Sequence, residues 1–291
     1  MMVTDSGCLA MKLYKCGAQA SDPWPERPRP AERNAHHRHR RRNAMEPFTY
    51  EAIAKMIDHS LLNPSLTTSE LEEGCELAVR YNVASVCIMP YSLGRCAELL
   101  AGTTVNPSTT IGFPHGGHTT AVKLAEARQA LTDGGKELDV VINISKARSG
   151  DWQYVRDELK TLTQNIHAQA AKIKVIFENA YLDDATKIRL CEICGEIGVD
   201  WVKTSTGYAG SGATLPDLQL MRKHSPARVQ VKAAGGIRDL DTLLGVRAVG
   251  VTRVGATRTE AMLEDCRKRL GLKPISQPAP AAAQPAATAG Y

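Results

Sequence analysis

Three charged residues lie within otherwise apolar runs that have the β-branched composition of strands. They are Asp139 in ELDVVIN, Lys203 in VDWVKTSTG and Lys232 in VQVKAAGGIR. Burying a charge costs free energy unless the charge is paired, so these residues are candidates for a functional site. By strand alternation, Asp139 shares a face with Val141, and Lys203 shares one with Trp201. If these faces point into one interior, a carboxylate and two ammonium groups meet there.

A carboxylate beside two lysines suits Schiff-base catalysis. Lysine attacks a carbonyl only as the free amine, and its ordinary pKa of about 10.4 leaves little of that form at neutral pH. Burial and a second ammonium group both lower this pKa. Lys232 would supply that second charge to Lys203, and Asp139 would move protons through a water molecule. The alternative is a buried ion pair between Asp139 and one lysine, with the other lysine extending outward.

Glycine and hydroxyl residues after the same runs indicate a phosphate site. Residues 204–207 (TSTG) follow Lys203, Gly235 and Gly236 precede Arg238, and residues 255–257 (GAT) follow the last strand-like run. In (β/α)₈ barrels the loops after strands seven and eight commonly bind phosphate through backbone N–H groups and a helix N-terminus. Glycine is also common in ordinary turns, so the indication depends on two such loops occurring together.

The elements that would position these residues alternate between strand and helix. The sequence predicts strands at 57–61, 84–88, 109–113, 137–143, 173–178, 199–203, 228–233 and 249–254. It predicts helices in the segment that opens with Thr67 and Glu70, in the segments that carry Leu124 and Leu190, and near 92–100, 151–170, 215–224, 239–246 and 257–269. Eight such units indicate an α/β fold, the (β/α)₈ TIM barrel. A doubly wound sheet is the alternative, although no strand is followed by G-x-G-x-x-G.

The two ends of the chain differ in composition from its body. Of the chain's 36 Lys/Arg and 31 Asp/Glu, residues 1–44 hold nine basic and four acidic residues, so the remainder is neutral. We therefore expect a disordered, basic, proline-rich arm at 1–44, a barrel at 45–273 and a flexible Pro/Ala-rich tail at 274–291. For the arm we weigh a nucleic-acid contact, a targeting peptide, no function, and a translation start at Met45. We favour no function.

The segments IDHSLL, IGFPHGG, ELDVVIN, VKTSTG and VKAAGGIR occur in this order in the body. Together they resemble the deoxyribose-phosphate aldolase family of class I aldolases. The resemblance implies a (β/α)₈ barrel that reversibly cleaves 2-deoxy-D-ribose 5-phosphate into acetaldehyde and D-glyceraldehyde 3-phosphate, without a metal or other cofactor. It implies that Lys203 forms the Schiff base, Lys232 lowers its pKa and Asp139 relays protons. It places Asp58 and Thr206 near the sugar hydroxyls, and its phosphate-binding positions fall on Gly207, Gly235, Gly236, Arg238, Gly255 and Thr257.

The sequence departs from the family pattern at the phosphate end. Tyr208 stands where some members have a lysine, and Arg258 follows Thr257 where many members have a second small hydroxyl residue. These changes leave open a different phosphorylated or non-phosphorylated aldol substrate for the same Schiff base. Tyr291 resembles a terminal tyrosine found in some members and is a candidate proton relay on the tail. An inert terminus is the alternative.

Two further groups of residues have other candidate roles. His59, His115 and His118 would suit a zinc-dependent aldolase if they converged, but turn and cap histidines are the preferred interpretation. Cys191 and Cys194 form C-x-x-C within a helical segment, where we expect them to pack on the apolar face rather than act in redox chemistry. Cys87 is expected to be a small buried residue, with a position near the pocket as the alternative.

The composition also limits the setting in which the protein works. No apolar run approaches the ~20 residues that a membrane span needs. The eight cysteines are scattered and follow no secretory pattern, so we expect a cytoplasmic protein without a disulfide framework. Its expected partners are small phosphosugar and aldehyde substrates. We expect no membrane or nucleic-acid partner. A homodimer is one assembly that the sequence allows. The remaining non-enzyme alternative is a barrel that binds nucleic acid through its basic arm.

Overall fold

The computed structural model describes residues 48–275. In it, eight parallel strands close into a barrel in the order in which they occur along the chain. The strands are β1 (Ile57–Leu61), β2 (Ser85–Ile88), β3 (Asn106–Ile111), β4 (Glu137–Val141), β5 (Lys172–Ile176), β6 (Trp201–Lys203), β7 (Gln230–Ala234) and β8 (Arg253–Ala256). The predicted TIM barrel is therefore confirmed and the doubly wound alternative is wrong, because β1 pairs with β8.

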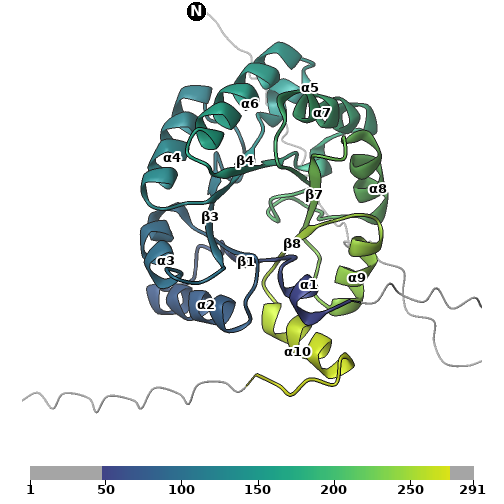
Figure 1. The fold of residues 1–291 in the computed structure, drawn as a ribbon. Helices are drawn as coiled ribbons and strands as arrows, with labels where there is room; N and C mark the ends of the chain where they lie inside the picture. Colours follow the sequence, from purple (N-terminus) through teal and green to yellow (C-terminus); the bar gives the residue numbers. More distant parts are fainter. Residues whose placement is uncertain (1–47, 276–291) are drawn as a thin grey trace, which may run out of the picture. The chain divides into compact units, whose positions relative to one another are not determined.

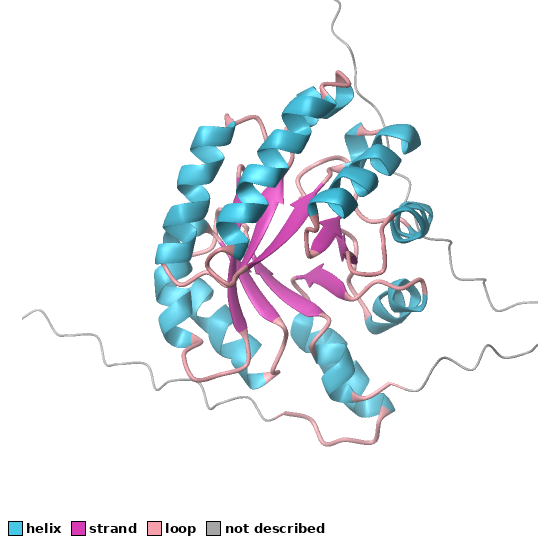
Figure 2. Ribbon diagram, turned by 45° about the horizontal axis from the view of Figure 1, so that its top comes forward, coloured by secondary structure: helices cyan, strands magenta, loops and turns pink. Residues whose placement is uncertain are grey.

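Helices form a ring around the barrel (Figure 1). They are α1 (Tyr50–Ala54), α2 (Thr68–Arg80), α3 (Leu93–Leu99), α4 (Thr120–Thr132), α5 (Ile144–Arg148), α6 (Trp152–His167), α7 (Asp184–Ile197), α8 (Leu215–His224), α9 (Leu240–Ala248) and α10 (Thr259–Arg269), with 3₁₀ turns at Pro90–Ser92 and Asn179–Tyr181. The turned view shows the strands enclosed by this helical layer (Figure 2). No helix among the described residues is long and apolar enough to cross a membrane.

Local sequence signals explain several helix boundaries. The predicted capping box forms at the start of α2, where Thr67 accepts from the backbone N–H of Glu70 and the Glu70 side chain accepts from that of Thr67. Leu71, Cys75 and Ala78 are buried on one face of this helix. Gly198 ends α7 in the left-handed conformation, with φ of 84°. These helices bury their apolar faces around the barrel and hold the strands in place.

One local prediction is wrong, and two short helices were not predicted. The last strand was expected at 249–254, but β8 begins at Arg253 and includes Gly255 and Ala256. Val249 is the C-cap residue of α9, and Gly250 turns the chain at φ of 90°. Val249 therefore belongs to the end of the helix and not to the strand. Gly255 therefore lies within the strand rather than after it. The short helices α1 and α5 were not predicted, because five-residue helices are too short for a periodic pattern.

The predictions for the arm at 1–44 and for Tyr291 concern residues outside 48–275.

Candidate active site

Two lysines from neighbouring strands meet one carboxylate inside the barrel. Lys203 ends β6 and is the register partner of Lys232 on β7. Both Nζ atoms lie 2.7 Å from the same oxygen, Oδ2 of Asp139 on β4. Parallel pairing brings the lysines side by side, and barrel closure brings Asp139 across to them. The expected meeting of these three residues is confirmed.

All three side chains are removed from solvent. The exposed fraction is 3% for Lys203, 1% for Lys232 and 0% for Asp139. Neither lysine extends outward, so the alternative of one ion pair and one outward lysine is wrong. A single carboxylate between two ammonium groups leaves excess positive charge in a buried place, which favours loss of a proton from one lysine.

The two lysines differ in the direction in which their pKa values move. Burial lowers the pKa of Lys203, and the nearby charge of Lys232 lowers it further, although Asp139 opposes both effects. Burial also acts to lower the pKa of Lys232, but Asp139 and Asp58 outweigh it and raise that pKa. Lys232 touches two carboxylates, since its Nζ lies 2.6 Å from Oδ2 of Asp58. Lys203 is therefore the lysine that yields a free amine more readily.

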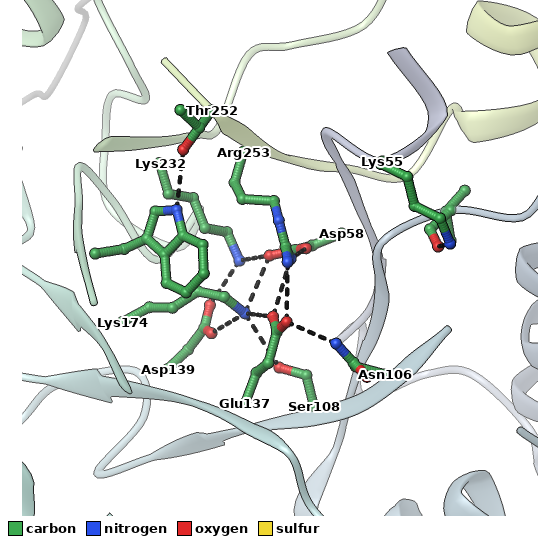
Figure 3. Close-up of polar contacts among 12 residues, drawn as sticks. Lys55, Asp58, Asn106, Ser108, Glu137, Asp139, Lys174, Lys232, Thr252 and Arg253 are labelled. Carbon is green, nitrogen blue, oxygen red and sulfur yellow. Dashed lines mark hydrogen bonds and ion pairs between the residues drawn. The ribbon is translucent and has the colours of Figure 1, made fainter. Parts of the chain in front are cut away.

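A larger group of charges continues beneath these residues (Figure 3). Lys174 on β5 places Nζ 2.6 Å from Oε2 of Glu137, 3.0 Å from Oδ1 of Asp139 and 3.1 Å from Oδ2 of Asp58. Arg253 on β8 contacts Asp58 at 2.5 Å and Glu137 at 2.9 Å. We call the whole group the charge cluster; its members are Asp58, Glu137, Asp139, Lys174, Lys203, Lys232 and Arg253.

Sequence reasoning did not identify Glu137, Lys174 and Arg253 as members. Each is a charged residue inside a strand, the same signal that identified Asp139, so two of them could have been found in ELDVVIN and IKVIFE. Arg253 was near the end of the predicted strand 249–254, whereas it is the first residue of β8. Asp58 was expected near the sugar hydroxyls. Asp58 is one of the residues that line the cavity described next, but its carboxylate is fully buried and paired with three basic side chains.

A cavity of about 900 Å³ opens above the charge cluster. Lys203, Lys232 and Asp58 lie on its wall. The same cavity is lined by seven residues expected to bind the sugar or its phosphate, namely Thr206, Gly207, Gly235, Gly236, Arg238, Gly255 and Thr257. The structure thus joins the lysines and the glycine-containing loops in one space.

The loop after β7 requires its glycines. Gly235 and Gly236 have φ of 81° and 86°, a region that L-residues with a side chain rarely adopt. A Cβ atom at Gly235 would also lie 2.8 Å from Cα of Gly212 in the loop after β6. Arg238, two residues on, is exposed at the cavity. These loops therefore line the cavity with bare backbone and with Arg238.

The helix after β8 begins without a side-chain cap. Arg258 occupies the N-cap position of α10 and makes no capping hydrogen bond, in contrast to Asp239, which caps α9. Uncapped N–H groups at a helix N-terminus attract anions. Thr257, the preceding residue, lines the cavity. This end of the cavity is therefore suited to a phosphate group.

The loop after β6 is held from outside the cavity by a residue that sequence reasoning missed. Glu178, buried and in the left-handed conformation at φ of 58°, accepts hydrogen bonds from both the backbone N–H and the hydroxyl of Thr206. The Thr206 hydroxyl in turn accepts from the backbone N–H of Tyr208 at 3.0 Å. Thr206 therefore shapes its own loop, and its hydroxyl proton is already donated.

Tyr208, in the loop after β6, lines the cavity. Its hydroxyl donates to the backbone carbonyl of Leu62, after β1, at 2.6 Å, and its ring meets Phe113 edge-on at 5.4 Å. The side chain is half exposed. A neutral phenol thus borders the cavity at the position where the sequence departs from the family pattern.

The three histidines considered for zinc do not converge. His59 lines the main cavity and its Nδ1 pairs with the Thr259 hydroxyl at 2.8 Å, whereas exposed His115 lines a separate cavity. Within residues 48–275 no group of three or more His, Cys, Asp and Glu side chains is placed to hold a metal ion. The zinc alternative therefore lacks its ligand set.

The cysteines pack as small apolar residues. Cys191 and Cys194 are fully buried on α7, as predicted. Cys87 on β2 is 2% exposed and borders the main cavity, so both interpretations of this residue apply. Burial raises the pKa of its thiol, and Asp139 adds to that effect.

Comparison with known proteins shows the family of this chain. The model of the DeoC/LacD aldolase family matches residues 52–256, more than half of the chain. A deoxyribose-phosphate aldolase from Rhodopirellula baltica is 62% identical over 231 residues, which cover 79% of this chain and 96% of the relative. One from Caldanaerobacter subterraneus is 41% identical over 218 residues, covering 75% and 94%.

A solved structure has the same fold. The tetrameric deoxyribose phosphate aldolase from Aeropyrum pernix superposes with a TM-score of 0.70 at 28% identity, covering 76% of this chain and 93% of that one. The matched family segment runs from β1 to β8 and so contains every member of the charge cluster. The protein is thus an aldolase and belongs to the DeoC/LacD aldolase family.

Proposed function

We propose that this protein reversibly cleaves 2-deoxy-D-ribose 5-phosphate into acetaldehyde and D-glyceraldehyde 3-phosphate, in the breakdown of deoxyribonucleoside sugars, through an imine on Lys203. One observation carries the proposal. Lys203 and Lys232 contact the same oxygen of Asp139 at the wall of a cavity that Gly235, Gly236 and Arg238 also line. The relatives named deoxyribose-phosphate aldolase support the choice of substrate.

The reaction begins at the open-chain aldehyde. The free amine of Lys203 adds to C1, and loss of water from the carbinolamine gives a protonated imine. A base then takes the proton of the C3 hydroxyl, the C2–C3 bond breaks, and its electron pair forms an enamine while C3 leaves as the aldehyde of glyceraldehyde 3-phosphate. Protonation at C2 and addition of water release acetaldehyde and regenerate Lys203. The protons taken and returned balance over the cycle.

Lys232 and Asp139 have distinct parts in this proposal. Lys232 stays charged, because Asp139 and Asp58 hold its proton, and its charge favours the amine form of Lys203. Asp139 stays ionised. Burial would raise its pKa, but three lysines outweigh burial and hold that pKa far below the usual range. Imine formation engages the Lys203 nitrogen elsewhere, so Oδ2 keeps the contact from Lys232 but loses the one from Lys203, and a water molecule that relays protons can take that place.

The phosphate would bind where the loops after β7 and β8 line the cavity. We assign it to the backbone of Gly235 and Gly236, to Arg238, and to the uncapped N-terminus of α10 after Gly255 and Thr257. Gly207 and Tyr208 border the same space. Since Thr206 donates its proton to Glu178, its part in this proposal is to fix the loop rather than to recognise a sugar hydroxyl.

A cleavage assay tests the function. Glyceraldehyde 3-phosphate and acetaldehyde should form in equal amounts from 2-deoxyribose 5-phosphate, and EDTA should leave the rate unchanged. Tyr208 brings no positive charge to the cavity, so a non-phosphorylated or different phosphorylated aldol is the second candidate substrate. A higher kcat/KM for 2-deoxyribose than for its 5-phosphate would favour that candidate. We further propose that the enzyme works in the cytoplasm, and a homodimer remains a prediction for its assembly.

A further inference from the structure

Lys174 lies beneath the proposed nucleophile. It is the register partner of Asp139 on β4 and of Trp201 on β6, whereas Lys203 is the partner of Ile176. Lys174 therefore lies two residues nearer the N-terminal end of β5 than the level of Lys203. Its side chain is 0% exposed and does not line the cavity above. It can influence a substrate only through the side chains that it contacts.

Those contacts are with three carboxylates at once. The Lys174 ammonium lies within 3.1 Å of oxygens on Glu137, Asp139 and Asp58 (Figure 3). It donates to Oδ1 of Asp139, while the two other lysines share Oδ2. Burial acts to lower the pKa of Lys174, but the three carboxylates outweigh it and raise that pKa well above the ordinary value. Lys174 is therefore a permanent positive charge.

Charge counting shows what this fixed charge does. The cluster contains three carboxylates and four basic side chains, all buried or nearly so. Lys174, Lys232 and Arg253 together neutralise the carboxylates, and the pKa of each is raised by them against the opposing effect of burial. Lys203, whose pKa is lowered by burial and by Lys232, is the fourth base. The cluster is electrically neutral when Lys203 is the uncharged amine.

We propose that Lys174 is a positioning residue for catalysis: it holds Asp139 from below and supplies the fixed positive charge that allows Lys203 to be a neutral amine. This inference rests on the proposed function. Without Lys174, the carboxylates exceed the remaining fixed cations by one. The ammonium of Lys203 would then be needed to neutralise Asp139, and most of the free amine would be lost at neutral pH.

Three groups act on Lys203 itself, namely Asp139 (β4), Lys232 (β7) and Cys87 (β2). The other charged groups of the cluster, Asp58 (β1), Glu137 (β4), Lys174 (β5) and Arg253 (β8), are linked to Lys203 through Asp139 and Lys232, and Ser108 (β3) contacts Lys174. Ser108 is neutral, and burial raises the pKa of Cys87, so it stays a thiol at neutral pH. The balance at Lys203 is thus set by the carboxylates and the three other bases.

The experiment measures how fast an aldehyde forms an imine on Lys203 at a series of pH values, with acetaldehyde as probe and borohydride to trap the adduct. Lys174→Met should move the midpoint of the pH profile upward by about one unit, which lowers trapping at pH 7 about tenfold. Glu137→Gln should move it downward, because it removes one negative charge. The double variant restores neutrality and should return the midpoint toward that of the unaltered enzyme.

Lys123→Met is the matched control. Lys123 is also fully buried and pairs with Glu158 at 3.0 Å, outside the cluster. Its loss should leave the midpoint unchanged. An unchanged midpoint in Lys174→Met, or an equal shift in the control, overturns the inference. If Lys174→Met does not fold, Glu137→Gln tests the inference instead. A pH midpoint that does not move downward in Glu137→Gln would then contradict it. Trapping by the unaltered enzyme reports separately on the proposed function.

Discussion

Lys203 and Lys232 are register partners on adjacent strands, and each places its ammonium nitrogen 2.7 Å from the same oxygen of Asp139. This relationship distinguishes two chemically identical side chains. Lys232 has a second carboxylate, Asp58, and keeps its proton, whereas Lys203 shares its only carboxylate. The asymmetry lies in the partners of each lysine rather than in its depth of burial.

Lys232→Met should reduce kcat/KM at neutral pH by about tenfold or more and move the pH profile to higher values. Removing the ammonium of Lys232 removes a charge that lowers the pKa of Lys203, so the amine appears only at higher pH. Rate measurements across a pH series test this. Lys232→Arg keeps the charge and should retain the original midpoint. A shift to lower pH in Lys232→Met would contradict the assigned roles.

Asp139→Asn should destabilise the fold by about 3–5 kcal/mol, because it leaves the buried ammonium groups of Lys174, Lys203 and Lys232 without their shared carboxylate. Urea unfolding at pH 7 measures the change. Asp157→Asn, on the exposed face of α6, is the control and should stay within about 0.5 kcal/mol of the parent. Equal stability of the two variants would mean that Asp139 does not hold the cluster together.

Arg238→Ala tests the phosphate end. A charge-assisted contact to phosphate contributes about 1.5–3 kcal/mol, so KM for 2-deoxyribose 5-phosphate should rise about tenfold or more. The kcat/KM for non-phosphorylated 2-deoxyribose should stay the same. Arg189→Ala removes an arginine that pairs with Glu192 on α7 and should change neither constant. An equal loss with both substrates would place Arg238 outside phosphate recognition.

His59 predicts how stability depends on acid. Burial lowers its pKa from 6.5 to about 4, so the folded protein keeps it neutral while the unfolded chain binds a proton below pH 6.5. Stability is therefore complete above that pH and falls as the pH drops toward 4, by roughly 3 kcal/mol in all. His59→Gln should remove this part of the pH dependence in urea unfolding. The same slope in the variant would assign the loss to other groups.

The sequence predicted the site best where a charged residue lies inside an apolar strand, because such a residue is hard to explain without a partner or a function. Charged residues inside apolar strands identified Asp139, Lys203 and Lys232, and the structure brings them together. Eight alternating units predicted the barrel, although β8 was misplaced, because Val249 has strand propensity but caps a helix.

Sequence reasoning could not find features that depend on the register between strands. Lys174 faces Asp139 only because β4 and β5 pair at those positions. The hydrogen bonds from Thr206 to Glu178 join two different loops. The positive φ of Glu178 could not be predicted either, because a positive φ is expected from sequence mainly at glycine. Register and loop conformation arise from packing of the whole barrel, which no local pattern encodes.

Borohydride trapping with acetaldehyde, followed by peptide mass spectrometry, shows which lysine forms the imine. We predict one reduced two-carbon adduct on Lys203, none on Lys232, and loss of trapping in Lys203→Arg. An adduct on Lys232, or full cleavage activity without any adduct on Lys203, would contradict it.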